Sequence, residues 1–522
     1  MVTGSRVAFT VDGRDVTVPD DGASLLAVLR DRLGLRSAKD GCSPQGQCGC
    51  CTVLVDGAPR VACVTPARRV AGRAITTVDG LDGARRWAEA FCVSGASQCG
   101  FCTPGIIVRL AALEARGTDP SDTAAVERAL AAHLCRCTGW NTIVEAWSLA
   151  TGHPVPGRPG RDLAAAARRA EIEGGAVQAV GAHVALGRGG FADDTAPPGA
   201  LVAVADGRGG WVVAETLMEA RVAAGKVQGR RTTIAVRHPI EVPPGDWDVT
   251  LCTTWVEPAY LETDASWCAP GGEPATPLAN GGAFGAKLPS VVAAAARALA
   301  DEHGCPVRVL LSREDTVRLG SKRPPMAAGA RADGTGAVRV ARTAGIASAI
   351  VSSAPGLVVT EVDVVGPPTS AALRAAGWAE AAVLLAGARR RAGPLTAPSG
   401  AVAEASIEAG RVLVRVSCGD PLDEVVLRSY CIGAAHMALG WVTSEAIAVD
   451  DDGEPHDLTV RSFGVLRCAD TPRIDVEIDR VGGLPVNGSD AVFAAVAAAV
   501  WVAQDCPPSL PTGRPVASVF EP

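Results

Sequence analysis

Residues 41–63, GCSPQGQCGCCTVLVDGAPRVAC, hold five of the 17 cysteines in this 522-residue chain. A [2Fe-2S] cluster needs four thiolates that converge on two irons, and plant-type ferredoxins take three of them from one glycine-rich loop spaced C-x4-C-x2-C. The loop therefore predicts one such cluster, with the order C-x5-C-x2-C-x11-C for Cys42, Cys48, Cys51 and Cys63. One extra residue separates the first two ligands, and Cys50 is a spare thiol. The choice among Cys48, Cys50 and Cys51 therefore stays open.

A second group of cysteines follows in QCGFCTPG and HLCRCTGW. The order C-x2-C-x32-C-x-C predicts a second [2Fe-2S] cluster, held by Cys99, Cys102, Cys135 and Cys137. Zinc is the alternative, because it also takes four thiolates. Zinc ribbons usually space both pairs as C-x2-C, so the C-x-C pair favours iron. The seven cysteines from Cys252 onward are scattered singly, and we expect them to be small buried side chains.

The predicted fold class is multidomain α+β. Alternating strands that turn at Asp12-Gly13 and Asp56-Gly57 indicate two hairpins, and they predict a β-grasp, ferredoxin-like domain over residues 1–78. Helical periodicity then predicts a four-helix [2Fe-2S]-binding domain over 79–152. Residues 153–169 are expected to form a Pro- and Gly-rich linker. Mixed strands and Ala-rich helices predict an α+β region over 170–522.

Composition excludes several classes of function. The net charge is −7 and no basic block is long, so neither nucleic acid nor an anionic membrane surface is an expected partner. The longest apolar run, 491–503, is shorter than the about 20 residues of a bilayer span, so it predicts a buried helix. The N-terminus lacks the pattern of a secretory signal. We expect a cytoplasmic protein with reduced thiols.

The motifs QCGFCTPG, LCRCTGW and CGCCTVLVDG closely resemble the small iron–sulfur subunit of the xanthine oxidase family of molybdenum hydroxylases. The resemblance covers residues 5–150. It implies that the second cluster lies nearest a molybdopterin or molybdopterin cytosine dinucleotide, that the first lies nearer a flavin, and that Gln98 touches the pterin. His133 stands where the family usually has Asn, and we expect a structural role for it rather than a ligand role.

Residues 170–522 resemble a shortened, divergent large subunit of the same family. NGGAFGAKL is similar to its glycine-rich cofactor loop, and LRAAGWAEA to its arginine-containing segment. The resemblance implies cofactor-binding roles for Gly281, Gly282, Phe284, Gly285 and Arg374. A glycine-rich loop alone is a weak signal, because a turn before a helix has the same composition.

The catalytic residue of the family is not evident in this chain. Family members use a Glu near the C-terminus as the base, whereas PVNGSDAVFAA places Ser489 at that position and Asp490 one position later. Asp490 is the remaining candidate base, although a misplacement of about 1 Å can cost on the order of 100-fold in rate. The short stretch between Trp267 and Asn280 also lacks the family's glutamine-bearing substrate wall.

Three hypotheses of function follow. The first is an electron-transfer component, an oxidoreductase that passes electrons from a molybdopterin centre through two [2Fe-2S] clusters to a flavin or another acceptor. Its expected partners are a molybdenum catalytic subunit and an FAD-binding subunit, with a small-molecule substrate bound by the complex. The second is a self-contained compact hydroxylase, and the third is a non-enzymatic cofactor-handling protein.

Overall fold

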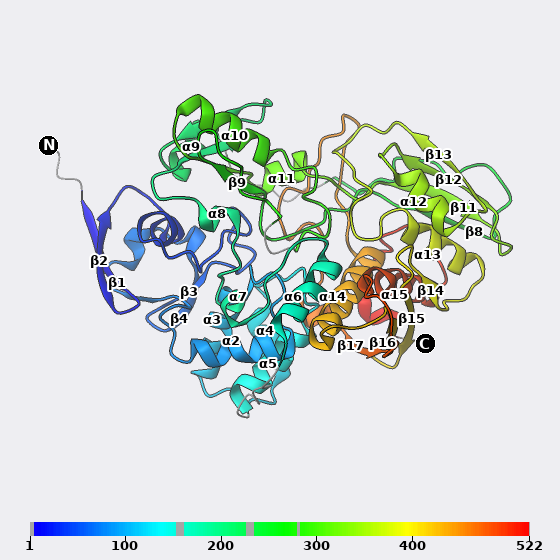
Figure 1. Cartoon of the computed structure of the whole chain (residues 1–522), viewed down its shortest axis with the longest axis horizontal. Coiled ribbons are helices and arrows are strands. Elements are labelled where there is room, and N and C mark those ends of the chain that lie inside the picture. Colours follow the sequence, from blue (N-terminus) through cyan, green and yellow to red (C-terminus); the bar gives the residue numbers. More distant parts are fainter. Residues whose placement is uncertain (1–4, 153–160, 226–233, 279–281, 521–522) are drawn as a thin grey trace.

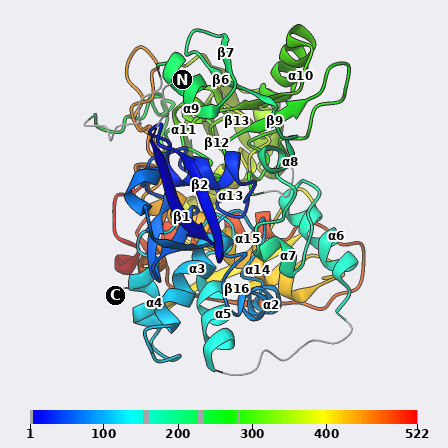
Figure 2. The ribbon, with the colours of Figure 1, turned by 90° about the vertical axis from the view of Figure 1, so that its left-hand side faces the viewer.

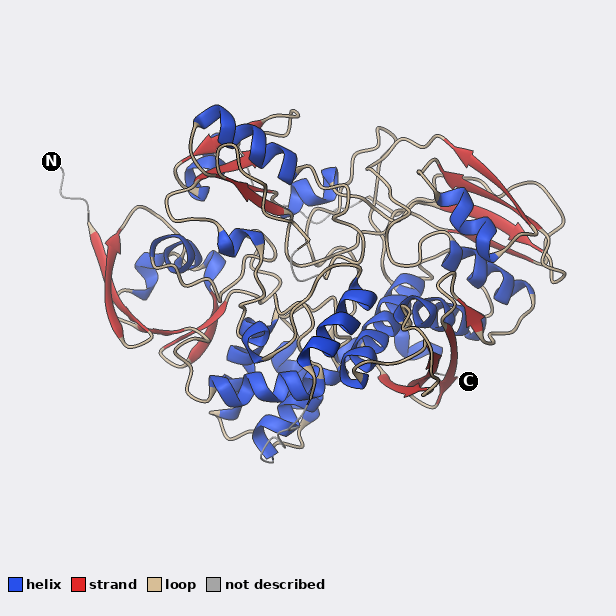
Figure 3. Cartoon of the chain, viewed as in Figure 1, coloured by secondary structure: helices blue, strands red, loops and turns tan. Residues whose placement is uncertain are grey.

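The computed structural model describes residues 5–152, 161–225, 234–278 and 282–520. Four sheets and the helices around them make up this part of the chain (Figures 1 and 3). The fold is multidomain α+β, as the sequence predicts. Figure 2, a view from the N-terminal side, shows the first sheet in front of the C-terminal helices.

The first sheet has the order β2-β1-β5-β3-β4 and is antiparallel except between β1 and β5. Both predicted hairpins are confirmed, because β1 pairs with β2 across Asp12-Gly13 and β3 with β4 across Asp56-Gly57. Positive φ angles at all four turn residues match the type I′ turn that Asp-Gly favours. The strands are β1 (Arg6–Val11), β2 (Arg14–Pro19), β3 (Thr52–Val55), β4 (Ala58–Val61) and β5 (Ala74–Thr76). A helical segment, α1 (Leu25–Ala27) and η1 (Val28–Arg32), precedes the cysteine loop.

Four helices follow, where helical periodicity predicts them. They are α2 (Ala84–Ser94), α3 (Thr103–Glu114), α4 (Thr123–Leu130) and α5 (Asn141–Gly152). Pro104 lies in the first turn of α3, and Asp122 caps α4 by accepting a hydrogen bond from the Ala125 amide.

The predicted linker, 153–169, overlaps a helix. Residues 153–160 lie outside the described residues, but α6 (Leu163–Gly174) begins within the predicted span. Asp162 accepts hydrogen bonds from the amides of Ala164 and Ala165, and the Ala-rich sequence that follows favours a helix. The Pro and Gly composition of the stretch before Asp162 concealed this start.

The second sheet, β7-β6-β10-β9, has a small core of its own with α10. Its strands are β6 (Leu201–Ala205), β7 (Trp211–Ala214), β9 (Ala265–Cys268) and β10 (Val307–Leu310). The helices of this part are α7 (Ala182–Ala185), α8 (Ala192–Thr195), α9 (Leu217–Ala223), α10 (Val292–His303) and α11 (Arg313–Leu319).

The third sheet, β13-β12-β11-β8, lies at the opposite end of the molecule from the first (Figure 1). Its elements are β8 (Val249–Cys252), β11 (Met326–Ala330), β12 (Gly336–Ala341), β13 (Leu357–Val362), α12 (Ile346–Ser353) and α13 (Trp378–Ala388). The fourth sheet is β14-β15-β16-β17, with β14 (Leu395–Thr396), β15 (Val402–Glu408), β16 (Arg411–Ser417) and β17 (Arg473–Ile478).

Two buried helices, α14 (Glu424–Thr443) and α15 (Ser489–Ala503), pack against each other in the centre. The predicted buried helix at 491–503 is confirmed as α15. In the described part of the chain, only α14 is long and apolar enough to cross a membrane, and 89% of its apolar window is buried inside the protein. One such helix is weak evidence for a membrane span, because the buried core helix of a soluble protein can be as long and as apolar.

One hydrophobic core links the N-terminal and C-terminal parts. It contains side chains of the first sheet, of α2 to α5 and of α14 and α15. The cysteine loops therefore lie against the C-terminal region rather than in a separate unit.

Candidate functional site: two thiol quartets

The loop between η1 and β3, together with the turn that follows β4, brings four buried thiols together. The Cys42 thiol lies within hydrogen-bonding range of Cys48 and Cys63, and the Cys63 thiol within range of Cys51. Backbone amides also point at these sulfurs, from Gln45 to Cys42 Sγ at 3.1 Å and from Cys63 to Cys51 Sγ at 3.5 Å. Hydrogen bonds from the Cys48 and Cys63 thiols hold the pKa of Cys42 well below its usual range. We call these four thiols the first quartet.

The spare thiol, Cys50, is fully buried beside the first quartet. It lies in hydrogen-bonding range of Cys48, and a Cβ placed on Gly41 would lie 3.1 Å from both sulfurs. Cys50 also interacts electrostatically with Cys102 and Cys135. The Cys50 side chain is therefore situated between the two groups of cysteines.

A second quartet forms where α3 begins and where α4 leads into α5. Cys99 Sγ lies 3.6 Å from Cys137 Sγ, and Cys102 lies in hydrogen-bonding range of Cys135. The contact with Cys102, together with Thr138 Oγ1 at 3.1 Å, lowers the pKa of Cys135 to about 6. In both quartets the thiols meet pairwise, as the two irons of one cluster require. Among the described residues no group of three or more His, Cys, Asp or Glu side chains has the geometry for a single metal ion.

The described part of the glycine-rich loop lies against the second quartet. Gly282 has φ +87°, and a Cβ there would lie 3.2 Å from Cys99 Sγ and 3.4 Å from Cys137 Sγ. Gln98 Nε2 donates to the Cys137 carbonyl and to Ser429 Oγ, both at 2.9 Å. Gln98 Oε1 is buried without a partner. Gly281 lies outside the described residues.

The other predicted site residues meet at the start of α15. Arg374 Nε donates to Asp490 Oδ1 at 3.1 Å and Arg374 Nη2 to Ser489 Oγ at 3.0 Å, while its guanidinium lies 3.9 Å from the centroid of the Phe284 ring. Gly285 approaches so closely that a Cβ would lie 1.8 Å from the Ala372 carbonyl oxygen. Burial raises the pKa of Asp490. The resemblance thus located residues that are far apart in sequence and adjacent in space.

Comparison with known proteins agrees with the two quartets. Residues 9–74 match the 2Fe-2S iron-sulfur cluster binding domain, and residues 77–148 match the [2Fe-2S] binding domain. The nicotine 6-hydroxylase small subunit of Paenarthrobacter nicotinovorans is 45% identical over 144 residues, which are 27% of this chain and 86% of that subunit. The xanthine dehydrogenase iron-sulfur-binding subunit of Escherichia coli O157:H7 is 42% identical over 127 residues, which are 24% of this chain and 79% of that subunit. The chain belongs to the xanthine oxidase family of molybdenum hydroxylases.

The chain covers only a small share of the length of larger family members. Xanthine dehydrogenase of Drosophila pseudoobscura pseudoobscura is 38% identical over 163 residues, which are 28% of this chain and 12% of that enzyme. The structure of aldehyde oxidoreductase from Desulfovibrio gigas matches with a TM-score of 0.72 at 15% identity, covering 99% of this chain and 100% of the other. At that identity the match shows a shared fold, which extends the family's architecture over the C-terminal part.

The donor set fits iron–sulfur clusters, but the C-terminal residues do not fit a molybdopterin. The cavity beside Phe284 and Arg374 measures about 40 Å³, and those beside Gln98 and Gly282 about 20 Å³ and 10 Å³. Pockets that bury organic ligands measure roughly 300–1,000 Å³. The polar side chains around Arg374 are already paired with each other. This closed arrangement leaves no room for the cofactor.

The sequence did not indicate two buried glutamates that bind the residues around the second quartet and the start of α15. Arg136, between the two C-terminal ligands of the second quartet, forms a buried bidentate ion pair with Glu445 at 2.6 Å and 2.7 Å. Glu173 accepts from the amides of Gly488 and Ser489 at 3.0 Å and 2.8 Å. No local motif marks either glutamate for this role, because Arg136 and the amides of Gly488 and Ser489 lie more than 300 positions from their partners; Glu173 also pairs locally with Arg169.

His133 has the structural surroundings that the sequence predicts. It is buried, and its Nε2 lies 3.2 Å from Thr52 Oγ1. Burial lowers its pKa to about 3, so the ring is neutral. A Cβ on Gly49 would lie 2.4 Å from the imidazole, so the ring packs tightly against the first loop.

Proposed function

We propose that this chain is an iron–sulfur electron-transfer component of a molybdenum-dependent hydroxylase or dehydrogenase. The observation that carries the proposal is the pair of buried thiol quartets. Cys42, Cys48, Cys51 and Cys63 would hold one [2Fe-2S] cluster, and Cys99, Cys102, Cys135 and Cys137 the other. Each cluster, when bound, accepts and donates one electron.

The protein's own residues set the conditions for that transfer. All eight thiols are at most 9% exposed, so water is largely excluded. Amide hydrogen bonds to Cys42 and Cys51 would raise the reduction potential of a cluster held there. Electrons would enter at the second quartet and leave from the first, and the Cys50 side chain lies between them.

The C-terminal region would serve as a docking part in this proposal. The relatives that match most of their own length are small subunits, which supports separate molybdenum and FAD-binding subunits as partners. In this proposal residues 1–78 hold the first cluster, residues 79–152 hold the second, and residues 170–522 dock the partner subunits. The complex would act in the cytoplasm. The alternative is the compact hydroxylase with Asp490 as its base, but the closed space around Phe284, Arg374 and Asp490 disfavours it, because that space does not fit the cofactor the reaction needs.

Metal analysis and electron paramagnetic resonance (EPR) of the full chain, purified without air, test the proposal. We expect about four irons per chain, no stoichiometric molybdenum and two distinct rhombic signals after dithionite reduction. Cys63→Ala and Cys137→Ala should each remove one signal, whereas Cys305→Ala, away from both quartets, should keep both. Stoichiometric molybdenum would favour the compact hydroxylase. Zinc without [2Fe-2S] signals would overturn both readings.

A further inference from the structure

A buried ion pair borders the second quartet. Arg136 stands between the ligands Cys135 and Cys137, and its Nη1 and Nη2 donate to the two carboxylate oxygens of Glu445 at 2.6 Å and 2.7 Å. Its Nε donates to the Pro258 carbonyl oxygen at 2.9 Å. The side chains of the pair are 6% and 1% exposed. Glu445 follows the end of α14, so the C-terminal region supplies the charge that balances a cation of the second cysteine loop.

The positive end of this ion pair lies nearer the thiols than the negative end. The cavity of about 10 Å³ beside Gly282 is lined by Arg136 together with three thiols of the second quartet. Glu445 does not line that cavity. It lines, with Arg136, a separate cavity of about 40 Å³ that has no cysteine among its described residues. The guanidinium therefore faces the quartet, and the carboxylate lies behind it.

The other buried cations of these two cavities have carboxylate partners of their own. The pairs are Lys287–Glu262 at 2.6 Å, Arg323–Glu380 at 2.5 Å and Arg374–Asp490 at 3.1 Å. Glu257, another carboxylate of the larger cavity, lies 3.0 Å from Lys322. These carboxylates are already engaged, so loss of the Glu445 charge would leave one buried positive charge uncompensated beside the second quartet.

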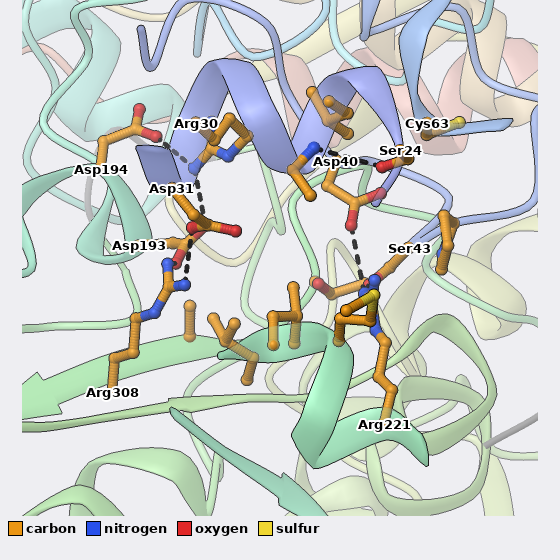
Figure 4. Close-up of a pocket in the computed structure, with 18 of the residues that line it drawn as sticks. Ser24, Arg30, Asp31, Asp40, Ser43, Cys63, Asp193, Asp194, Arg221 and Arg308 are labelled. Carbon is orange, nitrogen blue, oxygen red and sulfur yellow. Dashed lines mark hydrogen bonds and ion pairs between the residues drawn. The ribbon is translucent and has the colours of Figure 1, made fainter. Parts of the chain in front are cut away.

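The ion pairs beside the first quartet are built differently (Figure 4). Two arginines there have two carboxylate partners each, which are Asp193 at 2.6 Å and Asp194 at 2.8 Å for Arg30, and Asp31 at 2.7 Å and Asp193 at 2.9 Å for Arg308. Loss of one carboxylate leaves the other in place. Within the described residues Arg136 has a single carboxylate partner, Glu445. Its charge balance therefore depends on one residue.

The balance of charge beside a cluster affects its reduction potential. Reduction adds one negative charge to the cluster, so a nearby positive charge stabilises the reduced form and raises the potential, whereas a nearby negative charge lowers it. Water screens such charges weakly when they are buried. Both side chains of the Arg136–Glu445 pair are buried, so each of the two charges should act on the second cluster with little screening.

We propose that Glu445 lowers the reduction potential of the second cluster by neutralising Arg136. Glu445 acts through Arg136 and is therefore a positioning residue. This inference rests on the proposed function and deepens it, because a lower potential at the second cluster favours passage of the electron to the first. The C-terminal region would then tune electron transfer in addition to docking a partner.

An EPR-monitored redox titration of the full chain tests the role of Glu445. Glu445→Gln removes the charge but keeps the shape, so it should favour reduction of the second cluster by about 10-fold, which is a rise of about 59 mV for one electron. The first cluster should keep its potential. Arg136→Gln/Glu445→Gln also removes the positive end nearest the quartet, so its second cluster should titrate at or below the parent potential. Glu145→Gln, which breaks the exposed bidentate pair with Arg428, is the matched control and should change neither potential.

The double variant separates charge from packing. Loosened packing would admit water and raise the potential in the double variant as well as in Glu445→Gln. A rise in the double variant, or an unchanged second-cluster potential in Glu445→Gln, would overturn the proposal. Iron analysis accompanies each titration, and if Glu445→Gln lost iron, the double variant, which has no unpaired charge, would decide by the same criterion. Absence of [2Fe-2S] signals in the parent protein would instead overturn the proposed function.

Discussion

At the scale of single residues, Cys50 decides between two ligand sets for the first cluster. Its thiol contacts Cys48 and interacts electrostatically with Cys102 and Cys135, so we expect it to donate to the cluster rather than to bind iron. Cys50→Ala should keep about four irons per chain but lower the midpoint potential of the first cluster, since a hydrogen bond to a ligand sulfur is lost. Cys50→Ser should restore most of the potential. An EPR-monitored redox titration measures both variants.

Loss of two irons in Cys50→Ala would instead make Cys50 a ligand. Cys305→Ala is the matched control, because Cys305 is a half-buried thiol away from both quartets.

Residue-level prediction from the sequence was possible where chemistry imposes spacing. The eight predicted ligands meet in two quartets, because tetrathiolate binding needs particular intervals in the chain. It failed for Glu445 and Glu173, because the packing of distant segments brings Arg136 and the start of α15 to them. The predicted linker, 153–169, overlaps the start of α6 for a similar reason. Asp162 caps a helix only if the residues after it are helical, and the sequence pattern did not indicate that they are.

At the scale of elements, α14 covers the second quartet without spare room. A Cβ on Gly433 would lie 1.8 Å from the Cys137 carbonyl oxygen. Gly433→Ala should therefore push α14 away from the loop and destabilise the protein by roughly 1–3 kcal/mol. We expect a lower Tm and faster loss of the second-cluster EPR signal in air. Gly393→Ala, at a position with open space, is the control. Equal Tm values for the two variants would contradict this packing.

The same helix buries a histidine that gives a pH dependence. Burial lowers the pKa of His436 to about 4 from 6.5, and its Nε2 lies 3.2 Å from the Leu466 carbonyl oxygen. Because the unfolded chain takes up the proton first, the free energy of unfolding should fall as pH drops from about 6.5 to 4. The slope is at most about 1.4 kcal/mol per pH unit. His436→Gln should flatten this part of the stability profile, measured by thermal unfolding across pH. An unchanged profile would show that His436 titrates normally.

At the scale of the whole molecule, the N-terminal module is completed by the C-terminal region. The shared core joins them, and two ion pairs reinforce it: Arg136–Glu445 and Arg428–Glu145, each at 2.6 Å. The matches to the two cluster-binding domain families end at residue 148. Sequence comparison alone therefore gives no sign that the C-terminal region packs against the N-terminal module. The structure instead places α14 directly over the second quartet.

A truncated chain tests whether that cover protects the clusters. Residues 1–152 alone would expose the face that α14 buries, so oxygen and water would reach Cys99 and Cys137. We expect the truncated protein to take up iron but to lose visible absorbance in air several-fold faster than the full chain. The EPR signal of the second cluster should disappear before that of the first. The reason is that the truncated chain still contains the strands that flank the cysteine loop of the first quartet. Equal bleaching rates would show that the C-terminal region does not shield the clusters, which would leave docking of a partner as its remaining contribution.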